Sequence, residues 1–314
     1  MSVQSSGSPQ ASPMAYNRHV QPFRKILVAL AGIDTDKQLL DYAAMLAGIS
    51  AGAELHCVHV TGASSAGNRW IASALESEVR AALEPLPSEQ VSCHVLEGER
   101  TDALLSFATT AGTDLILLGH RRNRSGRRSL ARRLAMEAPC SIWMVPEGSP
   151  ASLRTILVPI DFSRRAADAL SVGTAIAEAA GLDECLALHV YFNKAAVTFD
   201  EYDEIIAEEK GQAFCLFVAP IDLHGVHAKP LFVEGANVAD TINRVAAEQK
   251  ADLIVMGTRG RSRSAAVLLG SETEQAIIDT KIPILAVKHF GARRKLVEVL
   301  LDKRLRQRGD QRFT

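Results

Sequence analysis

The sequence predicts an α/β protein of two tandem doubly wound parallel-sheet domains, each Rossmann-like with five strands and related by internal duplication. Three observations predict this fold. Apolar runs of five or six residues alternate with alanine-rich stretches of helical spacing, this order occurs twice, and the second half of the chain repeats motifs of the first. The length of 314 residues leaves room for two such domains.

Five segments of the first half recur in the same order in the second half, each an apolar run typical of a strand buried on both faces. The offset between partners grows slowly from 130 to 142 residues, which indicates a duplicated domain with small insertions. The pairs are Lys25–Leu30 with Thr155–Ile160, Leu55–Val60 with Cys185–Val190, Val95–Gly98 with Phe232–Gly235, Asp114–Gly119 with Asp252–Gly257, and Ser141–Val145 with Pro283–Val287.

Helical stretches lie between these runs. Leu39–Ala47 and Ala166–Ala180 are alanine-rich and have helical spacing, and Gly181 ends the second stretch. Strand–helix alternation through five strands implies right-handed crossovers and an open sheet. In such sheets ligands bind beyond the carboxyl ends of the strands, where strand order reverses. The residues that follow the first and fourth strands of each repeat are therefore the candidate ligand positions.

The repeat divides the chain into four parts. We expect a flexible N-terminal arm over residues 1–22, a first unit over 23–146, a second unit over 152–290 and a basic C-terminal tail over 291–314. The arm is dominated by Ser, Gly, Pro and Gln and lacks the apolar stretch of a signal peptide. The tail has leucines at helical spacing, which predicts an amphipathic basic helix that either caps its own domain or docks on a partner.

Composition excludes several classes of protein. The formal net charge of −1 argues against a strongly basic nucleic-acid binder, and no apolar run is long enough to span a membrane. The five cysteines form no CxxC pair, so a reducing, cytoplasmic location is expected rather than a disulfide scaffold. His224 and His227 are spaced as a metal pair, but no third ligand has suitable spacing, so a loop with two histidines is favoured and no metal site is predicted.

The loop after the fourth strand of the second unit has a phosphate-binding pattern. Gly257 and Gly260 are followed after nine residues by Gly270 and Ser271, which spells G-x2-G-x9-G-S. Glycines let backbone amides approach a phosphate, and Ser271 has the spacing of a helix cap, where unpaired amides attract anions. Taken alone, the pattern favours an ordinary glycine-rich loop before a capped helix. Three arginines in the loop would add positive charge, namely Arg259, Arg261 and Arg263.

Two further motifs give this pattern a family resemblance. The first strand of the second unit ends in Val158-Pro159-Ile160-Asp161, and the second strand ends in His189-Val190. Together with G-x2-G-x9-G-S, these motifs resemble the universal stress protein family, whose ATP-binding members have V-P-x-D, H-V and this loop. The resemblance covers both units, so the chain is similar to a tandem universal stress protein.

The resemblance implies a site for ATP, with Mg²⁺, in the second unit. Asp161 would hydrogen-bond the ribose or the adenine side of ATP, Val190 would meet the adenine edge through its backbone, and Gly257 would lie near the ribose. For Asp161 the alternative is a helix cap, and His189 is expected to be a structural histidine. The phosphates would be surrounded, mainly through backbone amides and the serine hydroxyl, by Gly260, Gly270, Ser271 and Glu272.

The first unit has lost the pattern. Ala31 stands at the position of the carboxylate, Arg122 stands at that of the second glycine, and Asp34 is expected to cap the next helix. The loop after the fourth strand is also four residues shorter, so ATP binding in the family manner is not expected there. The arginines of this loop would bind a polyanion or, in the preferred interpretation, form a solvated face neutralised by acids elsewhere. They are Arg121, Arg122, Arg124, Arg127, Arg128, Arg132 and Arg133.

Three functions remain open from the sequence. The favoured one is an ATP-binding stress-response protein whose second unit binds ATP and signals through conformation or partner binding. The alternatives are an interaction or scaffold module without nucleotide, and a slow ATPase. The sequence has no Walker lysine and no paired carboxylates around the loop, so no catalytic residue is assigned. We expect strand Ile142–Val145 to pair with Ile284–Val287 within the chain, with an unidentified protein partner and a homodimer left open.

Overall fold

The structure of the protein is a computed structural model that describes residues 22–32, 36–62, 68–120, 130–192, 200–258 and 280–288. Of the helical residues 68–70 and 200–207 only the backbone is described. The predicted tail and all but the last residue of the predicted arm lie outside the described residues, so both stay predictions.

The first unit alternates strands and helices in the predicted order. The predicted helix over Leu39–Ala47 is confirmed and extends by three residues before its start and two after its end. The elements are β1 (Lys25–Leu30), α1 (Asp36–Ile49), β2 (Glu54–Thr61), α2 (Asn68–Ala82), a short 3₁₀ turn (Ser88–Gln90), β3 (Val91–Glu97), α3 (Arg100–Ala111), β4 (Leu115–His120), α4 (Leu130–Glu137) and β5 (Ser141–Pro146).

The second unit repeats this order. Its first helix begins at Arg164 because Ser163 caps it, with the Ser163 hydroxyl accepting from the Ala166 N–H at 3.2 Å. Gly181 has a φ of +73° just beyond the helix end, which is the predicted stop. The elements are β6 (Ile156–Pro159), α5 (Arg164–Ala179), β7 (Glu184–Tyr191), α6 (Asp200–Val218), β8 (His227–Glu234), α7 (Val238–Glu248), β9 (Leu253–Gly257) and β10 (Ile284–Val287).

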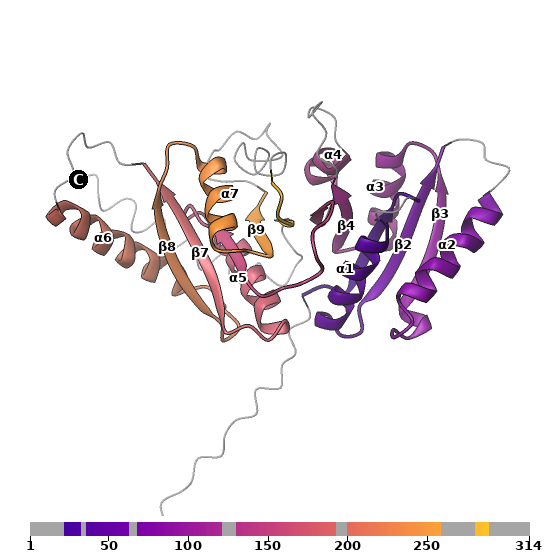
Figure 1. Cartoon of the computed structure of the whole chain (residues 1–314), viewed down its shortest axis with the longest axis horizontal. Helices are drawn as coiled ribbons and strands as arrows, with labels where there is room; N and C mark the ends of the chain where they lie inside the picture. Colours follow the sequence, from indigo (N-terminus) through magenta and orange to yellow (C-terminus); the bar gives the residue numbers. More distant parts are fainter. Residues whose placement is uncertain are drawn as a thin grey trace, which may run out of the picture.

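The strands of both units form one sheet of ten strands in the order β3-β2-β1-β4-β5-β10-β9-β6-β7-β8. Neighbours within each unit are parallel, and strand order reverses between β1 and β4 and between β6 and β9. The units meet where β5 pairs antiparallel with β10, with Trp143 opposite Leu285, as expected from the sequence. Figure 1 shows the two halves side by side, with helices on both faces of the sheet.

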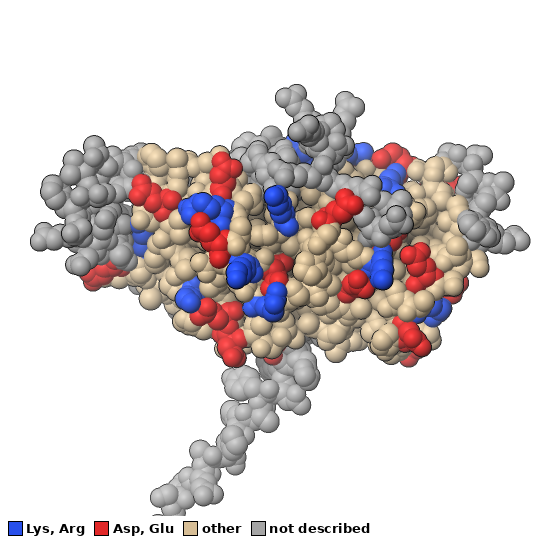
Figure 2. All heavy atoms as spheres, viewed as in Figure 1, with Lys and Arg blue, Asp and Glu red and all other residues tan. Residues whose placement is uncertain are grey.

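Apolar side chains fill both faces of the sheet because its parallel strands are covered by helices on each side. One buried cluster joins the sheet to α1, α2, α5 and α6, and the other joins it to α3, α4 and α7. Trp143, at the joint between the units, is among the largest fully buried side chains. Among the described helices, none is long and apolar enough to cross a membrane. On the face in Figure 2, the described acidic and basic side chains are interspersed.

An aspartate clamps the start of the first strand in both units. In the first unit the carboxylate of Asp114 accepts from the backbone N–H groups of Arg24 at 2.8 Å and Lys25 at 3.2 Å. In the second unit Asp252 accepts from Arg154 at 2.9 Å and Thr155 at 3.0 Å. The duplication therefore preserves backbone hydrogen bonding as well as strand order.

Lys288, the last described residue, fastens the second unit to the first. Its ammonium donates to the carbonyl oxygens of Met136 at 3.0 Å and Ala138 at 2.6 Å, at the carboxyl end of α4. A helix end leaves its last carbonyls without intrahelical partners and carries partial negative charge, so a cation there is favourable. The Lys288 backbone N–H also donates to the Ser141 hydroxyl at 3.1 Å, at the start of β5.

Candidate functional site at the strand-order reversal

Two of the predicted site residues lie at the carboxyl ends of neighbouring strands, where strand order reverses in the second unit. Asp161 follows β6, and Gly257 is the last residue of β9, the parallel neighbour of β6. Val190 lies near the carboxyl end of β7, on the other side of β6. This end of the sheet is where doubly wound folds bind their ligands.

Asp161 braces the turn that leads into α5. Its Oδ1 accepts from the Ser163 N–H at 3.0 Å, and the residue between them, Phe162, has a φ of +57°. A left-handed conformation is uncommon for a large side chain, so the turn is held by its surroundings. The helix-capping alternative is wrong in detail, because Ser163 caps α5 and Asp161 supports Ser163.

Gly257 is a site of close backbone approach. A Cβ atom there would lie 2.9 Å from the carbonyl oxygen of Arg165, in the first turn of α5. Real Cβ atoms essentially never come so close, so only glycine lets α5 begin directly beside the end of β9. The sequence pattern predicted that Gly257 belongs to a ligand site. It could not predict the contact with Arg165, because that contact depends on how α5 packs.

His189, as expected, has a structural partner. Its Nδ1 lies 2.9 Å from the carbonyl oxygen of Ile160 at the end of β6. Its ring also packs on Phe162, with 4.5 Å between the ring centroids. His59 of the first unit makes the corresponding contact, with Nδ1 3.3 Å from the carbonyl oxygen of Leu30. The same histidine therefore holds the ends of the first two strands together in both units.

The rest of the predicted phosphate site lies outside the described residues. The chain is described up to Thr258, which is 3% exposed, and again from Thr280. The Thr258 N–H donates to the carbonyl oxygen of Val287 at 3.2 Å, so the start of the intervening segment is bonded to the end of β10. Outside the described residues are Gly260, Gly270, Ser271, Glu272 and the three arginines of the loop, Arg259, Arg261 and Arg263.

The corresponding turn of the first unit is closed by an aspartate of its own. The Asp36 carboxylate accepts from the backbone N–H groups of Ala31 at 2.9 Å and Gly32 at 2.5 Å, and Asp36 is only 2% exposed. Asp34, the expected cap, lies outside the described residues. Sequence reasoning missed Asp36, although an acid in the first turn of a helix is a recognisable signal.

The other side of the first unit has a polar cluster between α3 and α4. Arg133 of α4 lies 3.6 Å from a carboxylate oxygen of Glu99, 3.3 Å from Asp102 and 3.7 Å from Glu137. For Arg133, these ion pairs agree with the interpretation that acids elsewhere neutralise the arginine face. A cavity of about 520 Å³ opens here, lined by Glu99, Arg100, Thr101, Leu130 and Arg133.

His120 ends β4 of the first unit, where the second unit has Thr258 beyond β9. Its side chain is 8% exposed, and its Nε2 has no hydrogen-bond partner among the described residues. Burial lowers the pKa of His120 because the charged imidazolium loses its hydration. The five arginines at 121–128 that follow it lie outside the described residues.

Comparison with known proteins identifies both halves of the chain with one family. The model of the universal stress protein family matches residues 22–146 and 152–288. A universal stress protein of Thermus aquaticus, encoded 3′ of a QAH/OAS sulfhydrylase, is 29% identical over 136 residues, or 43% of this chain and 98% of that protein.

Solved universal stress proteins share the fold. One from Archaeoglobus fulgidus covers 86% of this chain and 97% of its own, at 19% identity and a TM-score of 0.60. Another, solved in complex with cAMP, covers 40% of this chain and 97% of its own, at 21% identity and a TM-score of 0.35.

Proposed function

Since the chain belongs to the universal stress protein family, we propose that it is an ATP-binding stress-response protein with one nucleotide site, in its second unit. The observation that carries the proposal is that Asp161 and Gly257 lie at the carboxyl ends of adjacent parallel strands, where strand order reverses. Gly257 is also the first glycine of G-x2-G-x9-G-S, so the motif starts at the place where a ligand is expected.

In this proposal the nucleotide lies across the carboxyl ends of β9, β6 and β7. Asp161 uses its carboxylate for the ribose or the adenine side, and Val190 offers its backbone to the adenine edge. Backbone amides suit phosphates because they carry partial positive charge and, next to glycine, can be approached closely. The proposed phosphate contacts come from Gly260, Gly270, Ser271 and Glu272, with Gly257 near the ribose and Mg²⁺ held by the phosphates.

The first unit is proposed not to bind ATP in this manner. The backbone N–H groups of its first turn are already bonded to Asp36, and Ala31 has no side chain that could reach a ribose hydroxyl. We propose that it serves as the partner surface of the second unit, to which it is joined through β5 and β10. The output is then a change of conformation or of protein partner, in the cytoplasm.

The nucleotide content of the purified protein tests the proposal. The full chain is purified without added nucleotide and denatured, and the supernatant is separated by anion exchange. Bound ATP is expected, and Mg-ATP added to the nucleotide-free protein should raise its melting temperature, whereas cAMP serves as the competing ligand. ADP together with measurable turnover would instead identify an ATPase, and absence of both nucleotide and shift would contradict the proposal.

Three substitutions locate the site. Gly270→Trp and Ser271→Asp should each abolish the shift caused by Mg-ATP, because the first fills the phosphate loop and the second repels phosphate. Arg122→Ala, at the corresponding place in the first unit, should leave the shift unchanged. Equal loss in all three proteins would contradict a single site in the second unit.

A further inference from the structure

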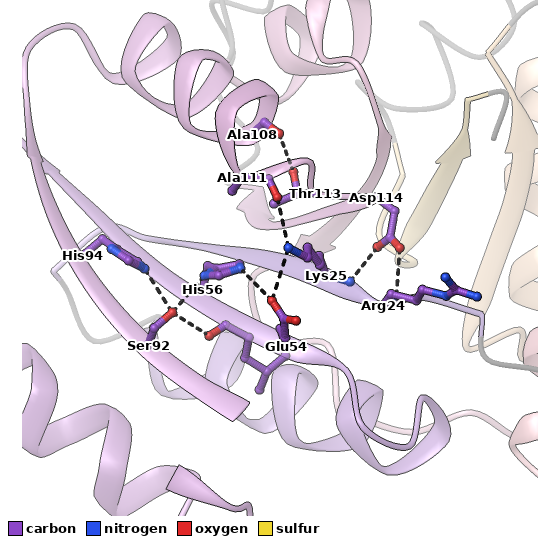
Figure 3. Close-up of polar contacts among 11 residues, drawn as sticks. Arg24, Lys25, Glu54, His56, Ser92, His94, Ala108, Ala111, Thr113 and Asp114 are labelled. Atoms are coloured by element: carbon purple, nitrogen blue, oxygen red, sulfur yellow. Dashed lines mark hydrogen bonds and ion pairs between the residues drawn. The ribbon is translucent and has the colours of Figure 1, made fainter. Parts of the chain in front are cut away.

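Two histidines in the first unit share one serine hydroxyl beneath α3. The Ser92 Oγ on β3 lies 2.8 Å from Nδ1 of His56 on β2 and 3.0 Å from Nε2 of His94 on β3 (Figure 3). The hydroxyl also donates to the carbonyl oxygen of Leu55 at 3.3 Å. We name His56, Ser92 and His94 the imidazole pair cluster.

The hydrogen bonds constrain the protons of this cluster. A hydroxyl has one proton, so Ser92 can donate to only one of its three partners, the Leu55 carbonyl oxygen or one imidazole nitrogen. At least one imidazole therefore donates to the Ser92 oxygen. The Nε2 of His56 is buried without a hydrogen-bond partner among the described residues.

Helix α3 rests on these two rings. The Phe107 ring has its centroid 4.8 Å from that of His94 and 5.6 Å from that of His56, and the two imidazole centroids are 5.6 Å apart. The charged groups facing the pair are Lys25 on β1 and Glu54 on β2, whose Nζ and Oε2 are 3.4 Å apart. Lys25 also donates to the carbonyl oxygen of Ala111 at the end of α3, at 3.4 Å (Figure 3).

Acid would change the cluster in two unequal steps. A proton on Nε2 of His56 would face the Glu54 carboxylate, 3.8 Å away, so the first charge has a counterion. A second proton, on His94, would place two cations side by side beneath an apolar ring. Burial lowers the pKa of both histidines, and the neighbouring His94 lowers that of His56 further, while Glu54 opposes this effect.

From this geometry we infer that the imidazole pair cluster is a proton-sensitive fastening of α3 to the sheet, with α3 held while both rings are neutral and released when both are charged. The helix begins beside the cavity that Glu99, Thr101 and Arg133 line, so release would alter that surface. The inference is independent of nucleotide binding, because every residue it uses lies in the first unit.

The sign of the pH effect follows from the pKa direction. A histidine with a lowered pKa binds fewer protons when α3 is fastened than when it is free and its pKa is about 6.5. The fastening is therefore complete above about pH 6.5 and weakens as pH falls through the window between 6.5 and the lowered values. For each additional proton taken up on release, the equilibrium constant for holding α3 on the sheet falls about tenfold per pH unit in that window.

The second unit supplies two controls for the experiment: a helix with leucines in place of the two histidines, and the residues to use in a variant of the first unit. Leu186 and Leu231 occupy the register positions of His56 and His94, and α7 corresponds to α3. The double variant His56→Leu/His94→Leu therefore carries the apolar pair that the second unit already packs. His120, whose pKa burial also lowers, is unchanged in this variant, so any contribution from it persists.

Hydrogen exchange of the full chain, measured by mass spectrometry at pH 7.5 and 5.5 and corrected for intrinsic rates, tests the inference. In the natural sequence the protection of α3 peptides should fall at least about tenfold at the lower pH, while α7 peptides keep theirs. The double variant should lose this difference. Equal loss in α3 and α7, or an unchanged acid response in the double variant, would overturn the inference.

An NMR titration of the natural sequence needs no variant. His56 and His94 should titrate below about pH 6.5 and in two coupled steps. Independent titration of both rings at or above that value would contradict the inference.

Discussion

The two units differ at the turn after their first strand. In the second unit Asp161 stands in the turn and accepts from the backbone N–H of Ser163, the residue that caps α5. In the first unit the position is Ala31, and Asp36 reaches back from α1 to take the turn's own N–H groups. Each unit therefore has a carboxylate at this turn, but from a different position in the chain. Asp161 lies just beyond the end of β6, whereas Asp36 is buried in the first turn of α1.

Two other sets of interactions are the same in both units. Asp114 and Asp252 clamp the first strands, and His59 and His189 contact the carbonyl at the end of those strands. These interactions hold backbone groups that any sheet of this order must satisfy. The units thus differ at the end of the sheet where a ligand would lie. The first two predictions below test that contrast, and the third tests the joint between the units.

The largest effect is expected for Gly257→Ala, with Gly119→Ala as its matched control. The added Cβ would lie 2.9 Å from a backbone oxygen of Arg165, whereas at Gly119 the nearest atom is Leu39 Cδ1 at 3.6 Å. Overpacking of this kind lowers the free energy of unfolding by about 1–3 kcal/mol, and the shifted α5 should also remove the response to Mg-ATP. Urea denaturation and melting curves measure both, and equal effects at the two glycines would remove the distinction between the units.

A carboxylate deletion in each unit separates stability from binding. Asp36→Ala leaves two backbone donors without their acceptor and should lower the free energy of unfolding by about 1–3 kcal/mol, with the Mg-ATP shift intact. Asp161→Ala removes the acceptor of the Ser163 N–H and should lower the free energy of unfolding by about 0.5–1.5 kcal/mol for that bond, while abolishing the Mg-ATP shift. Loss of the shift in the Asp36 variant alone would reverse the assignment of the site.

The smallest effect concerns the joint between the units. Lys288→Met removes the cation from the end of α4 and should lower the free energy of unfolding by about 1 kcal/mol. Lys281→Met, at an exposed position nearby, should change it by less than about 0.5 kcal/mol. Urea denaturation followed by tryptophan fluorescence, to which buried Trp143 contributes, provides the readout. Equal free energies of unfolding for the two variants would mean that the pairing of β5 with β10 holds the units together without the lysine.

Strand order and the joint could be predicted from the sequence because an internal repeat gives two samples of one pattern. The pairing of Ile142–Val145 with Ile284–Val287, expected because exposed edge strands invite pairing, and the helix stop at Gly181, expected because glycine commonly ends helices, are both confirmed. Contacts that depend on the register between strands could not be predicted. Ser92 meets His56 only because β2 and β3 align at those residues, and a single sequence contains no measure of that alignment.

The candidate site could be predicted only in part. Asp161 and Gly257 follow strands that the repeat identifies, so their meeting needed only the order of the strands. Asp36 was not predicted because comparison of the two repeats looks for a carboxylate at the position of Ala31. The carboxylate that bonds the turn is five residues further along the chain. The assignments of Gly260, Gly270, Ser271 and Glu272 stay predictions, since these residues lie outside the described part of the chain.

The pairing of β5 with β10 has a consequence for dosage. Two separate units that met through these strands would dissociate on dilution, whereas units on one chain face each other at an effective concentration set by the short connection between them. The ratio of the two kinds of unit is likewise fixed at one to one by translation. The ends of the described sheet are β3 and β8, and β8 carries Lys229 and Pro230, residue types that discourage further strand pairing. A cell that makes more or less of this protein therefore changes the number of paired units, but the fraction of units that are paired stays the same.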